Sequence, residues 1–186
     1  EVPPTEVPPT EVPPTEVPPT EKPFDPLFRD EELVEDVLKF NLTDIIQKSD
    51  YSFENRPDKE KRNIETIIVF LSALSPWDQK IITGLLADDF IEHNPTMPGT
   101  KTGFVKNLDQ LFTGVSPSMI EYDLKRIYAD NDYVITHSHF KSLPGVNASK
   151  IDIFKFNEDG RIIEHWDVIQ EIPEGSLNNN TIFYLD

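Results

Sequence analysis

The chain has 186 residues, with 34 acidic residues against 17 basic ones and a net charge of −17. This length predicts one domain with appendages, and the acidic balance disfavours nucleic acids and anionic membranes as partners. There are no cysteines, which excludes disulfides, thiolate nucleophiles and cysteine-ligated zinc. The longest uninterrupted apolar run, residues 67–71, is far too short to cross a bilayer.

The N-terminal region is of low complexity. Residues 1–20 are four copies of E-V-P-P-T, which cannot build a core because proline pairs force extended polyproline-II geometry. We therefore predict a semi-rigid acidic linker over residues 1–26, either a spacer that displays the domain or a tail with no partner. Three N-x-S/T triplets, at Asn41, Asn147 and Asn179, and a first residue other than Met allow a secreted origin. The compartment stays open.

Helical periodicity follows the linker. Asp30 precedes an apolar stripe that runs to about residue 48, so residues 27–58 are expected to form an N-terminal helix and a polar connection. Further helices are predicted at 59–74, 78–87 and 103–112, each with apolar residues at helical spacing. The main domain is expected at 59–175, and residues 176–186 form a C-terminal tail.

The hydrophobic period changes to two after about residue 115. A short strand is predicted at 89–94, and four more at 119–128, 133–141, 150–156 and 161–170, separated by turn sequences such as N-E-D-G. Helices followed by an antiparallel meander indicate the α+β class.

The last predicted strand carries two ionisable residues on one face. Alternation places His165 and Asp167 together with Ile163 and Ile169, while the other face carries Ile162, Glu164, Trp166 and Val168. If the short N-E-D-G turn pairs Phe156 with Arg161, then Asp152 lies directly across from His165 and shares its face. Phe154, on the same predicted strand as Asp152, shares this face as well.

Histidines elsewhere in the chain extend this polar set. His137 and His139 share a face of the strand before Asp152, and the same orientation would align His139, Asp152 and His165 across three strands. His93 and Asn94, at the end of the first strand, are the other candidates to enter this space. Either the core tolerates satisfied polar groups or a ligand cavity needs them, and we favour the cavity because each buried charge requires a partner or a role.

Four sequence stretches together resemble the SnoaL-like polyketide cyclase family over about residues 59–173: L-L-A-D-D-F, E-H-N-P, H-S-H and I-D-I-F-K-F-N-E-D-G-R-I-I-E-H-W-D-V-I-Q. The resemblance implies the cone-shaped fold of nuclear transport factor 2-like proteins, in which a curved antiparallel sheet wraps around three helices. The extra N-terminal helix falls outside that pattern. The resemblance also implies no metal or organic cofactor, and a pocket aspartate as general acid and base in an intramolecular aldol closure. Asp167 is the matching residue, with Asp152 second.

Three functions are weighed on this basis. The first is a cofactor-independent lyase, isomerase or cyclase that acts on a small carbonyl compound. Its catalytic residues would be Asp167, Asp152 and His165, and its substrate-binding residues His93, Asn94, His137, His139 and Phe154. The second is a non-catalytic ligand-binding or dimerisation domain on the acidic spacer. The third is a metal site of two histidines and one carboxylate, formed by His139, Asp152 and His165.

A homodimer is also expected. The face that carries Trp166, Ile162 and Val168 would be costly to leave in water, and relatives in the family commonly pair through this sheet face.

Overall fold

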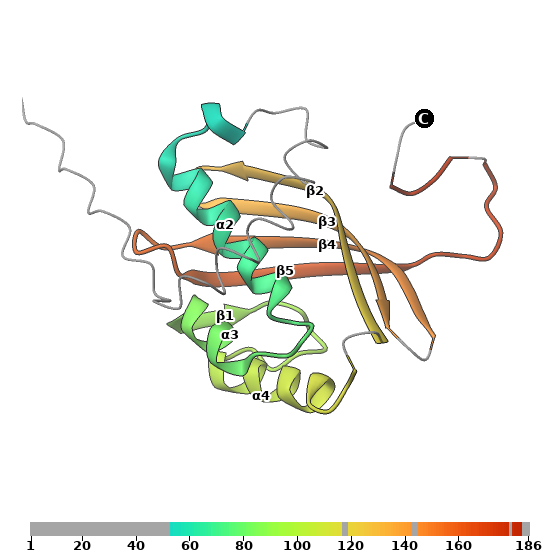
Figure 1. Ribbon diagram of the computed structural model, residues 1–186, viewed down its shortest axis with the longest axis horizontal. Coiled ribbons are helices and arrows are strands. Elements are labelled where there is room, and N and C mark those ends of the chain that lie inside the picture. The colour runs from blue at the N-terminus through green and yellow to red at the C-terminus, as the bar shows by residue number, and fades with distance from the viewer. Residues whose placement is uncertain (1–52, 117–118, 143–144, 179, 184–186) are drawn as a thin grey trace, which may run out of the picture.

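The computed structural model describes residues 53–116, 119–142, 145–178 and 180–183 (Figure 1). The E-V-P-P-T repeats and the helix predicted after Asp30 lie outside the described residues. A short 3-10 helix, η1 (Phe53–Asn55), comes first, and α2 (Asp58–Ser72), α3 (Gln79–Leu85) and α4 (Lys101–Phe112) follow along the chain. The three longer helices were predicted within two residues of these bounds. Within the described part of the chain, no helix is long and apolar enough to span a membrane.

Local capping explains where two of the helices begin. The side chain of Asp78 accepts a hydrogen bond from the backbone N–H of Ile81 at the start of α3. The Thr100 hydroxyl accepts in the same way from the N–H of Gly103 at the start of α4. Each cap satisfies an N–H group that has no partner within its own helix.

Five strands form one sheet in the order β1-β5-β4-β3-β2. Their bounds are β1 (Leu86–Glu92), β2 (Ile120–Asp130), β3 (Tyr133–Ser142), β4 (Val146–Phe156) and β5 (Ile162–Glu171). Strands β2 to β5 form the predicted antiparallel meander. Strand β1 instead pairs in parallel with β5, so the sheet is mixed and not wholly antiparallel. Since α4 and three strands separate β1 from β5 in the chain, no hairpin sets their relative direction.

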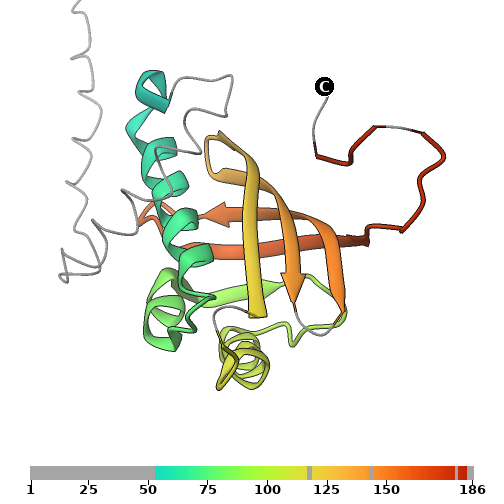
Figure 2. The same cartoon turned by 45° about the vertical axis from the view of Figure 1, so that its right-hand side comes forward.

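The sheet curves around the helices, with α2 across its inner face and α3 and α4 beside β1 (Figure 2). The inner face and the helices share one hydrophobic core, centred on Ile67, Ile82, Val134, Phe154 and Ile162, each at most 1% exposed. The α+β class with a curved sheet around three helices is confirmed.

The hairpin between β4 and β5 differs from the predicted register in two places. The backbone N–H of Asn157 donates to the carbonyl of Arg161, and Gly160 closes the turn at a φ of +77°, which favours glycine. Phe156 therefore pairs with Ile162 and not with Arg161. A bulge then leaves Ile163 unpaired before the regular ladder resumes.

Each difference shifts the pairing of β4 with β5 by one residue, and together they shift it by two. Because side chains alternate with a period of two, the residues beyond the bulge keep their predicted faces. Asp152 lies directly opposite Asp167, and Phe154 lies opposite His165, so the predicted direct pair of Asp152 with His165 is wrong. The bulge also turns Ile162, which was expected on the outer face, into the core, where it is completely buried.

Candidate active site

The inner face of the sheet changes from apolar to polar along the strands. Its deep end is apolar and includes Phe156 and Ile162. The next rows, read across β3, β4 and β5, place polar side chains on the same face. Beyond them lie the aromatic rings of Tyr122 and Phe140, whose centroids are 5.0 Å apart. The polar rows contain Thr136, Ser138, Lys150, Asp152, His165 and Asp167.

A histidine between two carboxylates forms the first half of a hydrogen-bonded ring. The Nδ1 atom of His165 lies 2.7 Å from Oε2 of Glu92, at the end of β1. Its Nε2 atom lies 3.1 Å from Oδ1 of Asp152 on β4. Both carboxylates can accept a hydrogen bond only if both ring nitrogens carry protons, so this geometry favours the imidazolium form.

A lysine between two carboxylates forms the second half. The Nζ atom of Lys150 lies 2.7 Å from Oδ1 of Asp152 and 3.0 Å from Oδ2 of Asp167. Asn94 donates from Nδ2 to Oδ1 of Asp167 at 2.5 Å, and its backbone N–H donates to Oε1 of Glu92 at 2.8 Å. The bond from Asn94 to Glu92 connects the two halves, so the hydrogen bonds and ion pairs form a closed ring. We call these six residues the carboxylate ring: Glu92, Asn94, Lys150, Asp152, His165 and Asp167.

The charges in the ring determine how its members titrate. Burial lowers the pKa of His165, but the hydrogen bonds to Asp152 and Glu92 outweigh burial and raise this pKa above its ordinary value. Burial alone would raise the pKa of Asp152, yet Lys150 and His165 lower it to about 2. Asp152 is therefore an ionised carboxylate at any physiological pH.

Lys150 and its neighbour Tyr122 stay protonated for related reasons. Burial disfavours the ammonium form, but Asp152, Tyr122 and Asp167 outweigh burial and raise the pKa of Lys150 well above its ordinary value. Burial raises the pKa of the Tyr122 phenol, so this group keeps its proton. The Lys150 ammonium lies 5.8 Å from the centroid of the Tyr122 ring.

Access differs between the members of the ring. The side chains of Glu92 and Asp152 are 0% and 1% exposed, whereas those of Asp167 and Lys150 are 8% and 14% exposed. Asp152 also accepts from the Thr136 hydroxyl at 3.2 Å, which gives it three donors. Asp167 is thus the most accessible of the three ring carboxylates and lies beside an ammonium group.

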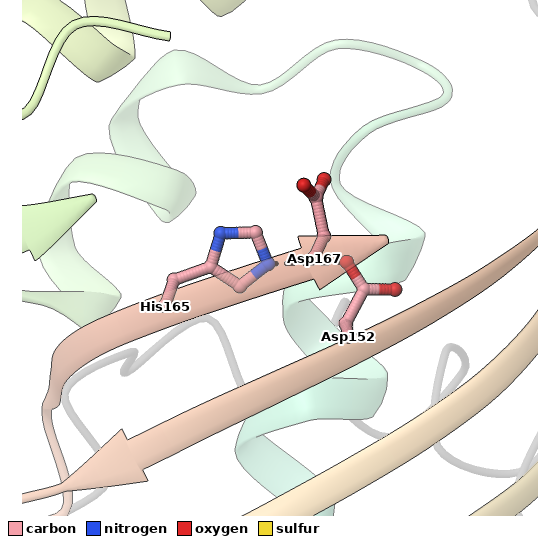
Figure 3. Close-up of side chains that lie close together, drawn as sticks. All are labelled: Asp152, His165 and Asp167. Atoms are coloured by element: carbon pink, nitrogen blue, oxygen red, sulfur yellow. Dashed lines mark hydrogen bonds and ion pairs between the residues drawn. The ribbon is translucent and has the colours of Figure 1, made fainter. Parts of the chain in front are cut away.

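Three of the predicted residues lie together, as Figure 3 shows: His165 and Asp167 project from β5 on the same side as Asp152 from β4. The expectation that Asp152 reaches His165 across the hairpin is confirmed, although along a diagonal and not between directly opposed residues. The catalytic roles of these residues stay predictions.

The expectation that His137 and His139 enter the cavity is wrong. On β3, the buried face carries Val134, Thr136 and Ser138, so the two histidines point to the outer face. The phase was ambiguous because apolar residues occur on both faces of this strand. His137 contacts Ser149 at 2.9 Å and His139 contacts Asn147 at 2.7 Å. The row of His139, Asp152 and His165 therefore does not exist.

The remaining predicted ligand-binding residues divide between the two faces. Asn94 belongs to the ring. His93 lies on the outer face, stacked on Trp166 at 4.4 Å and bonded to Glu164 at 3.0 Å, so the prediction that all four histidines line one cavity is wrong. Phe154 packs within the core, with ring centroids 5.5 Å from Phe70 and 4.7 Å from His165.

Sequence reasoning missed four polar residues of the inner face, namely Glu92, Thr136, Ser138 and Lys150. Alternation could have found two of them, since Glu92 stands two residues before Asn94 and Lys150 two residues before Asp152. Thr136 and Ser138 could have been found only with the phase of β3, which the sequence leaves ambiguous.

The ring does not fit a metal ion well. Ligand atoms of Asp152, His165 and Asp167 lie within 4.8 Å of one another. However, the Lys150 ammonium lies within 3.0 Å of both aspartates, and both nitrogens of His165 already face carboxylates. The predicted metal set fails separately, because His139 is on the outer face.

A separate hollow of about 390 Å³ lies between α3, β1 and α4. It includes Asp88 and Lys101, which pair with each other at 2.9 Å. It contains no member of the carboxylate ring and is therefore separate from the candidate site inside the curved sheet.

The sequence profile described as SnoaL-like domain matches residues 69–165, which is more than half of the chain. The chain belongs to the SnoaL-like family. The match spans most of the ring, from Glu92 to His165, and ends two residues before Asp167. None of the curated proteins is a significant sequence match to this SnoaL-like chain.

Solved structures share the fold of this SnoaL-like chain at low sequence identity. A protein of Shewanella putrefaciens assigned as a SnoaL-like polyketide cyclase is 17% identical, with a TM-score of 0.51, covering 62% of this chain and 82% of its own. An LEH-like epoxide hydrolase of M. tuberculosis is 23% identical, with a TM-score of 0.51 and coverages of 60% and 85%.

A protein of Kribbella flavida assigned as a ketosteroid isomerase is 11% identical, with a TM-score of 0.54 and coverages of 69% and 92%. These likenesses establish the fold alone. The same fold therefore occurs in proteins named for three different activities.

Proposed function

We propose that this SnoaL-like chain is a cofactor-independent enzyme that moves a proton next to the carbonyl group of a small molecule, as a lyase, isomerase or cyclase does. The observation that carries the proposal is the pair formed by Asp167 and Lys150 at 3.0 Å, at the more accessible side of the ring. A base beside a fixed ammonium is the arrangement that enolate chemistry needs.

In the proposed reaction, Asp167 removes the proton from the carbon next to the carbonyl group. Asn94 and Lys150 each hold one oxygen of Asp167, and further lone pairs of the carboxylate remain able to accept a proton. Negative charge then develops on the carbonyl oxygen, where the Lys150 ammonium stabilises it. Asp152 and His165 act on this pair indirectly, because they hold Lys150 in place.

Two structural neighbours are named as a polyketide cyclase and a ketosteroid isomerase, and both named activities fall in the proposed class of reactions.

One observation favours a second function, a ligand-binding domain without catalysis. Each ring carboxylate already has at least two polar partners, so the ring also makes sense as a structural device within the cone.

Deuterium exchange separates the two functions. We expect the protein in D₂O to accelerate hydrogen exchange at the methyl group of acetophenone or at the α-carbons of cyclohexanone, followed by NMR. Asp167→Asn should lower this rate by about 10²–10⁴-fold with little change in thermal midpoint, since the isostere keeps its shape but cannot take the proton. Asp152→Asn should act more mildly, through the orientation of His165 and the position of Lys150.

Asp159→Asn is the matched control, because this residue lies exposed in the turn between β4 and β5. It should leave the exchange rate unchanged. A wild-type rate no faster than buffer with both ketones would argue against catalysis and for the binding domain.

A further inference from the structure

A buried hydroxyl group inside the sheet has no partner. Ser138, in the middle of β3, is 0% exposed, and its Oγ atom has no hydrogen-bond partner among the described residues. The hydroxyl of Thr136, on the same face of the strand, does have a partner, because it donates to Asp152 at 3.2 Å. Most buried polar side chains in native proteins are hydrogen-bonded, so a buried hydroxyl without a partner is a candidate donor for a ligand.

The surroundings of Ser138 indicate what that group is. In the sheet register, Ser138 lies directly opposite Lys150 on β4 and Leu124 on β2. One row further along the same face lie the rings of Tyr122 and Phe140. Ser138 therefore stands in the sheet between Lys150, whose ammonium also contacts Asp152 and Asp167, and apolar residues, so a ligand oxygen and a ligand hydrocarbon would each find a partner nearby.

The charge of the carboxylate ring restricts the ligand further. Three carboxylates, of Glu92, Asp152 and Asp167, face only two cationic groups, of Lys150 and His165. With these groups ionised, the ring carries a net charge of about −1, and like charge in a poorly solvated site disfavours an anionic ligand. An uncharged hydrogen-bond acceptor fits the site better than a carboxylate does.

We propose that Ser138 and Lys150 together bind the carbonyl oxygen of an uncharged, largely apolar ligand, and that Ser138 is a specificity-determining residue. The ligand class rests on the proposed function, whereas binding at this site does not require turnover. Ser138 donates to the oxygen, and the apolar body of the ligand lies against Leu124, Tyr122 and Phe140.

The test compares two probes with the same phenyl ring, acetophenone and benzoate, by isothermal titration calorimetry with the full chain. Wild type should bind acetophenone more tightly than benzoate. Ser138→Ala should weaken acetophenone binding by roughly three- to tenfold, as expected for one neutral hydrogen bond. The thermal midpoint of this variant should stay the same or rise, because the substitution removes a polar group that has no partner in the free protein.

Two variants serve as controls. Ser149→Ala removes a hydroxyl on the neighbouring strand that contacts His137 on the outer face, and it should leave binding unchanged. Thr136→Val removes a donor to Asp152, so it should lower the thermal midpoint, which Ser138→Ala should not. This contrast separates a hydroxyl that binds the ligand from a hydroxyl that stabilises the fold.

Tighter binding of benzoate, or no binding of acetophenone by wild type, would overturn the ligand class. A lower thermal midpoint with unchanged acetophenone affinity in Ser138→Ala would overturn the role of Ser138. Failure of the proposed catalysis looks different, since binding would follow the expected pattern while deuterium exchange in wild type stayed at the rate of buffer.

Discussion

Strand β5 presents two histidine–carboxylate pairs, one on each side of the sheet. On the inner face, His165 lies 2.7 Å from Glu92 and 3.1 Å from Asp152, with all three side chains buried. On the outer face, His93 lies 3.0 Å from Glu164, and both side chains reach solvent. The distances are similar, but the inner histidine is buried and has two carboxylate partners, so its loss leaves unpaired charge, whereas water can replace the outer pair.

Removing each histidine is the strongest way to test this comparison. His165→Gln leaves Glu92 without its cationic partner in a dry site, so we expect a loss of about 3 kcal/mol in the free energy of unfolding. His93→Gln should cost less than about 1 kcal/mol, because solvent screens the outer pair. Urea denaturation measures both, and equal losses in the two variants would show that burial does not distinguish the pairs.

The pH dependence of stability should differ between the two faces as well. Because the pKa of His165 is raised, its contribution is fully present below its ordinary pKa of 6.5 and is lost as pH rises through the higher folded value. Asp152 acts in the opposite direction, since its contribution is present above its ordinary pKa of 3.8 and is lost as pH falls toward about 2.

Urea denaturation between pH 6 and pH 9 tests the histidine part of this prediction. Wild type and His93→Gln should lose stability as pH rises, whereas His165→Gln should lack that component of the loss. If His165→Gln showed the same pH slope as wild type, the raised pKa of His165 would not contribute to stability.

The smallest expected effect concerns association through the outer face. We propose a homodimer that covers the apolar residues of this face, among them Ile135, Ile151 and Val168, the last of which is 69% exposed. Ile162 takes no part, since the bulge in β5 turns it inward. Sedimentation of wild type at micromolar concentration should show a dimer, and Val168→Asp should shift it to monomer. Monomeric wild type would contradict the proposal.

A matched substitution on the same strand sharpens this test. Glu171→Gln changes an exposed residue near the end of β5 and should leave sedimentation unchanged. Deuterium exchange on the Val168→Asp variant then shows whether association matters for the inner site, which the described chain forms from its own residues.

Local sequence patterns were sufficient for the elements and for part of the site. Helical spacing located α2 and α4, and the N-E-D-G turn indicated the hairpin that joins β4 to β5. Alternation placed His165 and Asp167 on one face, because two residues that stand two apart on a strand point the same way. The register expected for the N-E-D-G hairpin then added Asp152 from the neighbouring strand. The six-residue ring could not be read in this way, since it joins β1 to β5 across 73 positions of the chain.

Tertiary structure decided the direction of β1, the phase of β3 and the register of β5. The local sequence of β1 does not predict whether this strand runs parallel or antiparallel to β5, because no tight turn connects the two strands. The sequence of β3 offers apolar residues to both faces, so only packing against α2 decides that Ser138 points inward and His137 outward. The bulge at Ile163 exchanges which isoleucine is buried, while the ionisable residues beyond it keep their face. The sequence therefore determined which side chains share a strand face, and the packed fold determined which face became the site.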